Sequence, residues 1–152
     1  MDESRVAPHT LDPMYVRALV LCGAVERRPD GMEDLRAVLS EIQVPRDAPG
    51  LRFEFEAFIA IERNRDNAPH SMRVVVIDPT EREVNWTDPV HIPSTEGGTI
   101  RLSTPVLLQT IRPLDGRWRV LVEIDGIVKA HAPLDMYLVD PAEMGLPKRA
   151  SH

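Results

Sequence analysis

The sequence predicts an all-β protein built as an antiparallel two-sheet sandwich of seven to eight strands. Three observations carry this prediction. Several stretches alternate apolar and polar residues, the period of a strand with one buried face. The 14 prolines are spread along the whole chain and leave little room for long helices. An Asp-Gly pair, Asp125-Gly126, separates two β-patterned runs, which is the pattern of a tight hairpin.

The first predicted strand is Tyr15 to Cys22, and the segment after it supports two interpretations. Its apolar residues fall at helical spacing, with Asp30 and Glu33 positioned as a capping box. They are Met32, Leu35, Val38, Leu39 and Ile42. One short helix near residues 32–42 is therefore one interpretation, and a strand from Leu35 to Val44 is the other. The sequence leaves both open.

The clearest strand pattern runs from Leu51 to Ile61, where six apolar residues alternate with mostly charged ones. The second face of this strand begins charged but becomes apolar at Phe58 and Ala60. Either another part of the chain covers these two residues, or they form an exposed apolar patch that favours contact with another protein. On the second interpretation, Phe58 and Ala60 are candidate interface residues.

Three further strands are predicted in the middle of the chain, because each stretch is rich in β-branched, aromatic or aliphatic residues between Gly and Pro. They are Met72 to Asp78, Glu83 to Trp86 and Thr99 to Thr110. Asp78-Pro79-Thr80-Glu81 has the composition of a turn that joins the first two.

The closing hairpin is predicted from Arg117 to Val139. Trp118 is in phase with three aliphatic residues and is expected in the core, while Pro133 in the return strand marks an edge or a bulge. This hairpin completes one domain, residues 14–140, because a 17.1 kDa chain has material for a single core of ordinary size. Residues 1–13 and 141–152 are predicted to be flexible tails.

With these strands placed, the order of features resembles an uncharacterised bacterial β-sandwich family, a domain of unknown function. The resemblance covers Val16 to Val139 and rests on the motifs VRALVLC, SEIQVP, LRFEFEAFIAI, VVVIDP and RWRVLVEIDGIVKAHAPLDMYLV. The closing hairpin also resembles the last hairpin of immunoglobulin-like modules. The resemblance implies a fold and transfers no site residue.

Composition limits the function classes. The formal net charge is −6 and arginines alternate with acids, so we expect no nucleic-acid partner. The longest apolar run, Ala18 to Val25, is too short for a membrane span. The opening segment lacks the apolar core of a signal peptide and there is a single cysteine, from which we expect a cytoplasmic protein without a membrane partner.

No motif for catalysis was found, so we expect no enzyme, no catalytic or metal-binding residue and no cofactor. The five histidines lack metal-ligand spacing, and no glycine-rich phosphate loop or nucleophile elbow occurs. Cys22 ends an apolar strand with no His or Lys nearby in sequence, and is expected to be a buried small hydrophobe.

One loop combines groups that bind ligands: Trp86, Asp88 and His91 lie within six residues. They are candidate ligand-binding residues, although a tryptophan in this position is more often a core or core-edge residue that closes the sandwich. Two functional hypotheses follow. The leading one is a non-catalytic interaction or assembly module that binds itself or a protein partner through an edge strand or a sheet face. The alternative is a small-ligand or carbohydrate-binding sandwich, or an enzyme, with its site at residues 86–91.

Overall fold

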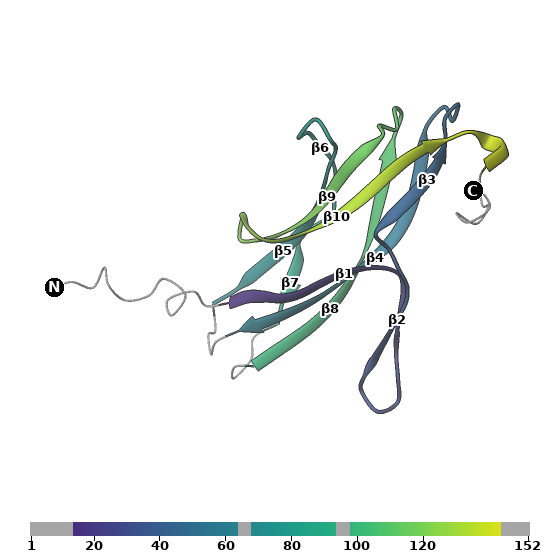
Figure 1. Ribbon diagram of the computed structural model, residues 1–152. Coiled ribbons are helices and arrows are strands. Elements are labelled where there is room, and N and C mark those ends of the chain that lie inside the picture. The colour runs from purple at the N-terminus through teal and green to yellow at the C-terminus, as the bar shows by residue number, and fades with distance from the viewer. Residues whose placement is uncertain (1–13, 64–67, 94–97, 144–152) are drawn as a thin grey trace.

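In the computed structural model, which describes residues 14–63, 68–93 and 98–143, two β-sheets face each other across one apolar core (Figure 1). The described residues form ten strands. These are β1 (Met14–Arg27), β2 (Glu33–Val38), β3 (Glu41–Pro45), β4 (Leu51–Arg63), β5 (His70–Ile77), β6 (Glu83–Trp86), β7 (Val90–Ile92), β8 (Gly98–Thr110), β9 (Gly116–Ile124) and β10 (Ile127–Val139). A short 3-10 turn, Pro141–Glu143, follows β10.

Sheet A has the order β2-β1-β4-β8, and sheet B has the order β3-β10-β9-β5-β6, with β7 also paired to β5. The all-β sandwich predicted from the sequence is confirmed. Neighbouring strands are antiparallel except β3 and β10, which run parallel from Glu41↔Asp135 to Pro45↔Val139. The strand count exceeds seven or eight because residues 33–45 form two strands, and because β7 occupies part of the expected 86–91 loop.

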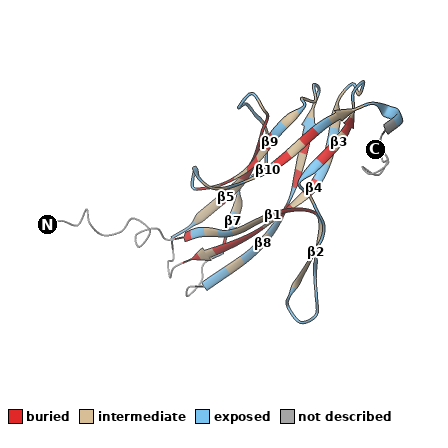
Figure 2. Cartoon of the chain, in the orientation of Figure 1, coloured by how far each residue is buried: buried red, intermediate tan, exposed pale blue. Residues whose placement is uncertain are grey.

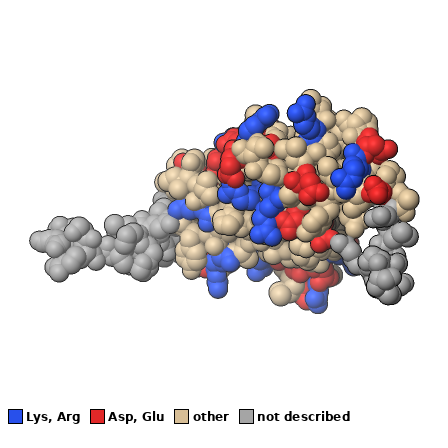
Figure 3. All heavy atoms as spheres, turned by 45° about the horizontal axis from the view of Figure 1, so that its top comes forward, with Lys and Arg blue, Asp and Glu red and all other residues tan. Residues whose placement is uncertain are grey.

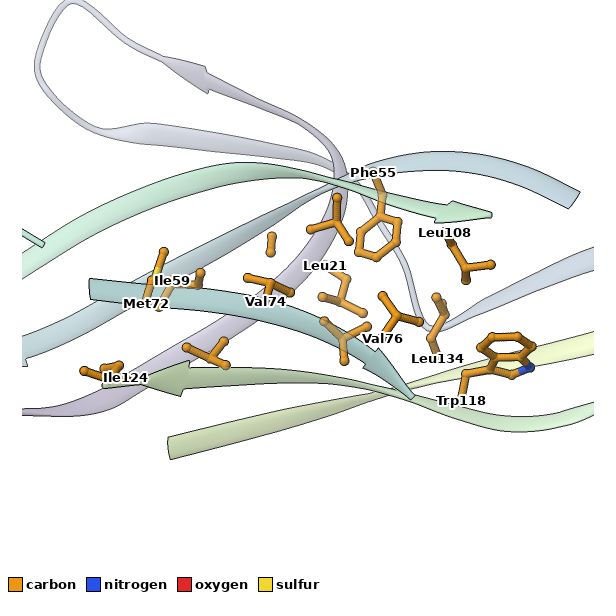
Figure 4. Close-up of a cluster of buried hydrophobic side chains, with 14 of the residues drawn as sticks. Leu21, Phe55, Ile59, Met72, Val74, Val76, Leu108, Trp118, Ile124 and Leu134 are labelled. Carbon is orange, nitrogen blue, oxygen red and sulfur yellow. The ribbon is translucent and has the colours of Figure 1, made fainter. Parts of the chain in front are cut away.

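Alternating side chains from both sheets fill the core, as the red bands along the strands in Figure 2 indicate. In β9, all four inward residues from Trp118 to Ile124 are at most 2% exposed. They meet Phe55 and Ile59 of β4 and Leu108 of β8 in the same cluster (Figure 4). The indole Nε1 of Trp118 donates to the carbonyl of Leu114 at 2.9 Å, so the one polar atom of this buried ring is paired.

Residues 32–44, for which the sequence left both a helix and a strand open, contain no helix. The chain pairs with β1 in sheet A as β2, crosses at Leu39 and Ser40, and continues in sheet B as β3. Ala37, within β2, has φ 56°, which lies outside the range of a right-handed helix. The apolar residues whose spacing resembles one side of a helix therefore point to different surfaces. Strand pairing with sheet A and then with sheet B overrides the helical spacing.

β1 and β2 form a hairpin that leaves sheet A near Gly23, and we call residues 24–36 the arm. A Cβ at Gly23 would lie 3.2 Å from the Cβ of Ala37, so the close approach of the two strands there favours glycine. The arm extends below sheet A in Figure 1, on the side away from sheet B.

Both predicted turns are confirmed. Asp125 and Gly126 have φ 52° and 83°, the two positive values that a tight hairpin between β9 and β10 requires. Asp78 closes the β5–β6 turn by accepting hydrogen bonds from the backbone N–H groups of Thr80 and Arg82, at 2.8 and 3.1 Å. The predicted tails, 1–13 and most of 141–152, lie outside the described residues.

Candidate binding groove at the edge of the sandwich

β8 is the last strand of sheet A, and its outer edge is open along most of its length. Its register with β4 is unbroken from Gly98 to Thr110 although Pro105 lies in the middle. Proline has no N–H, so residues in phase with Pro105 point their backbone groups away from β4. Gln109 is in phase with it, and its N–H indeed donates to Asn85 Oδ1 at 2.7 Å.

The outward backbone groups of β8 are therefore those of the odd residues, and we call residues 99–107 the β8 edge. Its outward residues are Thr99, Arg101, Ser103, Pro105 and Leu107. No other strand among the described residues pairs along it. An unpaired row of N–H and C=O groups is a template for a further strand.

A groove of about 370 Å³ runs beside the β8 edge. One wall is the chain from Asn85 to Val90, at the edge of sheet B, and the other is formed by Thr104, Pro105 and Leu107 of β8. The groove therefore lies where the edges of the two sheets meet, and Asn85 joins them at one end. We call it the Trp86 groove.

Trp86, one of the residues that line this groove, is 59% exposed. It ends β6 opposite Val75, which is fully buried. The next residue is fixed by two bonds to Val74: the Thr87 N–H donates to the Val74 carbonyl and Thr87 Oγ1 accepts from the Val74 N–H, both at 3.0 Å. A firmly held backbone thus presents an exposed indole.

The structure brings together two of the three predicted ligand-binding residues. Trp86 and Asp88 both line the Trp86 groove, whereas His91 is not among the residues that line it. His91 instead belongs to β7 and pairs with Ser71 of β5. The groove thus combines apolar surface from Trp86, Pro89 and Leu107 with the single carboxylate of Asp88.

The two predicted interface residues do not form an exposed patch. Ala60 is only 9% exposed and Phe58 is half-buried. Arg101, the β8 neighbour of Ala60, binds Glu33 of the arm, with 3.0 Å between Arg101 Nε and Glu33 Oε1. Because β1 and β4 lie between β2 and β8 in the sheet, this contact brings the arm back across the outer face. The chain itself shields the face that the sequence left open.

A second depression, of about 380 Å³, lies on sheet B between β5 and the β9–β10 hairpin, and its polar groups are already engaged. His70 Nδ1 lies 2.5 Å from Asp125 Oδ2, and the Ser71 N–H donates to Asp125 Oδ1 at 3.1 Å. The hydrogen bond to His70 lowers the pKa of Asp125. Arg73 Nε binds Glu123 at 2.7 Å. Opposite charges lie side by side across the face shown in Figure 3.

Cys22 is buried, as predicted, with no exposed surface. Burial and the nearby charge of Glu56 raise the pKa of its thiol, which disfavours the reactive thiolate. Within the described ranges, no group of three or more His, Cys, Asp or Glu side chains could hold a metal ion. In the same ranges, none of the helices is long and apolar enough to cross a membrane.

The β8 edge was not predicted, although the sequence contains a signal for it. Pro105 interrupts an otherwise regular strand pattern, and proline inside a strand is confined to edges and bulges. The hydrogen bond from Gln109 to Asn85 has no such signal in the sequence, because it depends on how the edges of the two sheets meet in the fold.

No protein-family model matches the chain, and no curated protein does. Among solved structures, 82% of the chain is similar to part of a β-glucuronidase from glycoside hydrolase family 2, with 14% identity and a TM-score of 0.52. The same share, 82% of the chain, is similar to part of an alkylpurine DNA glycosylase from Pseudomonas fluorescens bound to DNA, with 13% identity and a TM-score of 0.47. The chain spans 13% and 30% of those two proteins.

An immunoglobulin-like protein from Pseudomonas aeruginosa is also similar, with 14% identity, a TM-score of 0.39 and 97% of its own length covered. At these identities the likenesses concern the fold.

The predicted partners need a correction. We expected no nucleic-acid partner because the chain is acidic, but one structural neighbour is bound to DNA. The exclusion is therefore wrong. With 13% identity, the same likeness assigns no partner to this chain.

Proposed function

We propose that the chain is a non-catalytic interaction module that binds an extended segment of a protein along the β8 edge, beside the Trp86 groove. The observation that carries this proposal is the open row of backbone groups from Thr99 to Leu107 next to an exposed indole. A peptide that adds to a sheet edge gains affinity from main-chain hydrogen bonds and specificity from neighbouring side-chain pockets.

The groove supports this function over binding at a sheet face. The outer face of sheet A is shielded by the arm, and on sheet B charged residues such as Arg73 are paired with acids. Beside the β8 edge, in contrast, Trp86, Pro89 and Leu107 offer apolar surface to a bound side chain. Asp88 favours a positively charged residue in the bound segment. Tryptophan is among the residues that most often dominate binding energy.

The non-catalytic part of the proposal is supported by the state of Cys22, which is buried and whose thiol pKa is raised. The cytoplasmic compartment expected from the sequence remains part of the proposal.

The experiment is affinity capture from the source-cell lysate with the immobilised chain and three variants. Trp86→Ala removes the indole, and Ser103→Pro removes an edge N–H in the same phase as Pro105. Ile127→Ala, at another exposed apolar residue on β10, is the control. We expect a protein in stoichiometric amount on the wild type and the control, and its loss from both groove variants. Equal retention by all four chains would refute the proposal.

The alternative, a carbohydrate or small-ligand site, is favoured by one observation: Trp86 and Asp88 line the same groove. Aromatic faces beside hydrogen-bonding groups bind sugars as well as peptides. Titration with a panel of oligosaccharides, followed by the fluorescence of Trp86 in a Trp118→Phe background, distinguishes the two. A saturable change that is lost in Asp88→Ala, which keeps the Trp86 fluorophore, supports the alternative.

A further inference from the structure

We propose that the segment bound at the β8 edge is the β8 edge of a second copy of this chain, paired antiparallel about a two-fold axis at Ser103. This inference rests on the proposed function and specifies its partner. It follows from the order of donors, acceptors and charges along residues 99–107.

The outward groups of β8 are self-complementary in this register. With Ser103 opposite Ser103 of the second copy, Arg101 lies opposite Pro105 and Thr99 lies opposite Leu107. The four N–H donors of the edge, on Thr99, Arg101, Ser103 and Leu107, then each face a carbonyl. The carbonyl of Arg101 alone faces the proline that lacks an N–H.

The neighbouring registers are worse. Centring the pairing on Arg101 places two like charges opposite each other and leaves the Leu107 donor beyond the paired segment. Centring it on Pro105 places two prolines together and pairs Arg101 with Gln109, whose N–H already binds Asn85. Centring it on Leu102 also leaves the Leu107 donor beyond the paired segment, and centring it on Thr104 pairs Thr99 with Gln109. Of these registers, only that of Ser103 uses the whole edge and ends where Asn85 binds Gln109.

Charge complementarity favours the same arrangement. On the outer face of sheet A, Pro105 lies beside Glu56 of β4. An Arg101 opposite Pro105 is therefore two strands from Glu56, about 10 Å between backbones. Its guanidinium, which already binds Glu33 of its own arm, would also lie near the opposite charge of Glu56. Each copy supplies one Arg101 and one Glu56, so the dimer would contain this pair twice.

The groove accommodates the incoming strand. Pro105 and Leu107 line the Trp86 groove, so residues 99–101 of the second copy would lie along it, next to Trp86 and Asp88. The 59% exposure of Trp86 would fall on pairing. The two A sheets would join into one continuous sheet, and both open edges would disappear.

The first test is sedimentation velocity over a wide range of protein concentration. We expect a concentration-dependent dimer, with Trp86→Ala weakening it. Ser103→Glu places two carboxylates together on the axis and should raise the dissociation constant about fivefold. Ile127→Ala should leave it unchanged.

The second test fixes the register. Residues in a hydrogen-bonded antiparallel pair have Cα atoms about 5.5 Å apart, within the range of a disulfide. With oxidised glutathione as the oxidant, Ser103→Cys should form a disulfide-linked dimer, whereas the control Thr99→Cys, which faces Leu107, should not. Cys22 is buried and takes no part.

A wild type that stays monomeric, or a dimer in which Ser103→Cys does not cross-link, would overturn this inference. Neither result would refute the proposed function, because the capture experiment tests separately whether another protein binds at the β8 edge. Loss of capture together with a monomeric wild type would refute both.

Discussion

The side chain of Asn85 accepts a hydrogen bond from the backbone N–H of Gln109, with 2.7 Å between Oδ1 and N. The two residues belong to different sheets, so this bond joins the edge strand β6 to the edge strand β8. It also sets the limit of the open edge, because the outward donor at Gln109 is satisfied within the chain while residues 99–107 remain open to a further strand.

Asn85→Ala should lower the free energy of unfolding by about 1 kcal/mol, the typical net value of one hydrogen bond. The loss stays modest because water can reach the exposed Gln109. Chemical denaturation measures it. Gln109→Ala is the matched control, since it keeps the backbone donor, and an equal loss in both variants would contradict the role assigned to Asn85.

The two tryptophans should differ sharply in their contribution to stability. Trp118 has no exposed surface, so Trp118→Ala should cost about 3–5 kcal/mol in chemical denaturation. Trp86 is 59% exposed, and Trp86→Ala should cost far less. Similar losses for the two variants would be incompatible with this structure.

Asp125 should make stability depend on pH. Its pKa is lowered, first by the hydrogen bond with His70, so the folded state binds the proton less tightly than the unfolded state. This contribution is present above the unfolded pKa of about 3.9 and is lost as the pH falls through the folded pKa.

The matched variant is Asp125→Asn, because asparagine tolerates the positive φ of this turn. The melting temperature of the variant should lie below that of the wild type at pH 5, and the difference should shrink toward pH 2. A difference that stays constant over this range would contradict the assignment.

The position of the arm should depend on the ion pairs of Glu33. Its side chain is 6% exposed and lies between Arg27 and Arg101, at 3.2 and 3.0 Å. Glu33→Gln removes the charge at nearly constant volume and should accelerate hydrogen exchange of residues 24–36. Glu26→Gln, which affects an exposed pair with Arg36 at the same arm, is the control. Unchanged exchange in Glu33→Gln would show that this contact does not hold the arm.

The sequence predicted most of the fold because its strands follow simple physical rules. Leu51–Ile61 and Trp118–Ile124 alternate with period two, and Asp125-Gly126 supplies the positive φ values of a hairpin. Residues 32–44 could not be assigned, because their apolar side chains serve two sheets. That division depends on pairing with strands far away in the chain, which local periodicity does not encode.

The candidate site was predicted only in part. Trp86 and Asp88 were selected as an aromatic and a carboxylate in one loop, and both line the groove. His91 was selected by nearness in sequence, but the β7 strand places it outside the set that lines the groove. Phe58 and Ala60 were expected on an open surface, and the contact between Glu33 and Arg101 shows how the arm shields them.

The most direct test of the central claim is residue-resolved amide exchange of β8 by NMR, in dilute and in concentrated protein. Even-numbered amides pair with β4 and should be protected in both samples. The amides of Thr99, Arg101, Ser103 and Leu107 should exchange rapidly in the dilute protein and become protected as the edges pair, or when a captured partner is added. If these four amides are already protected in the monomer, or stay unprotected in every complex, the β8 edge is not the binding site.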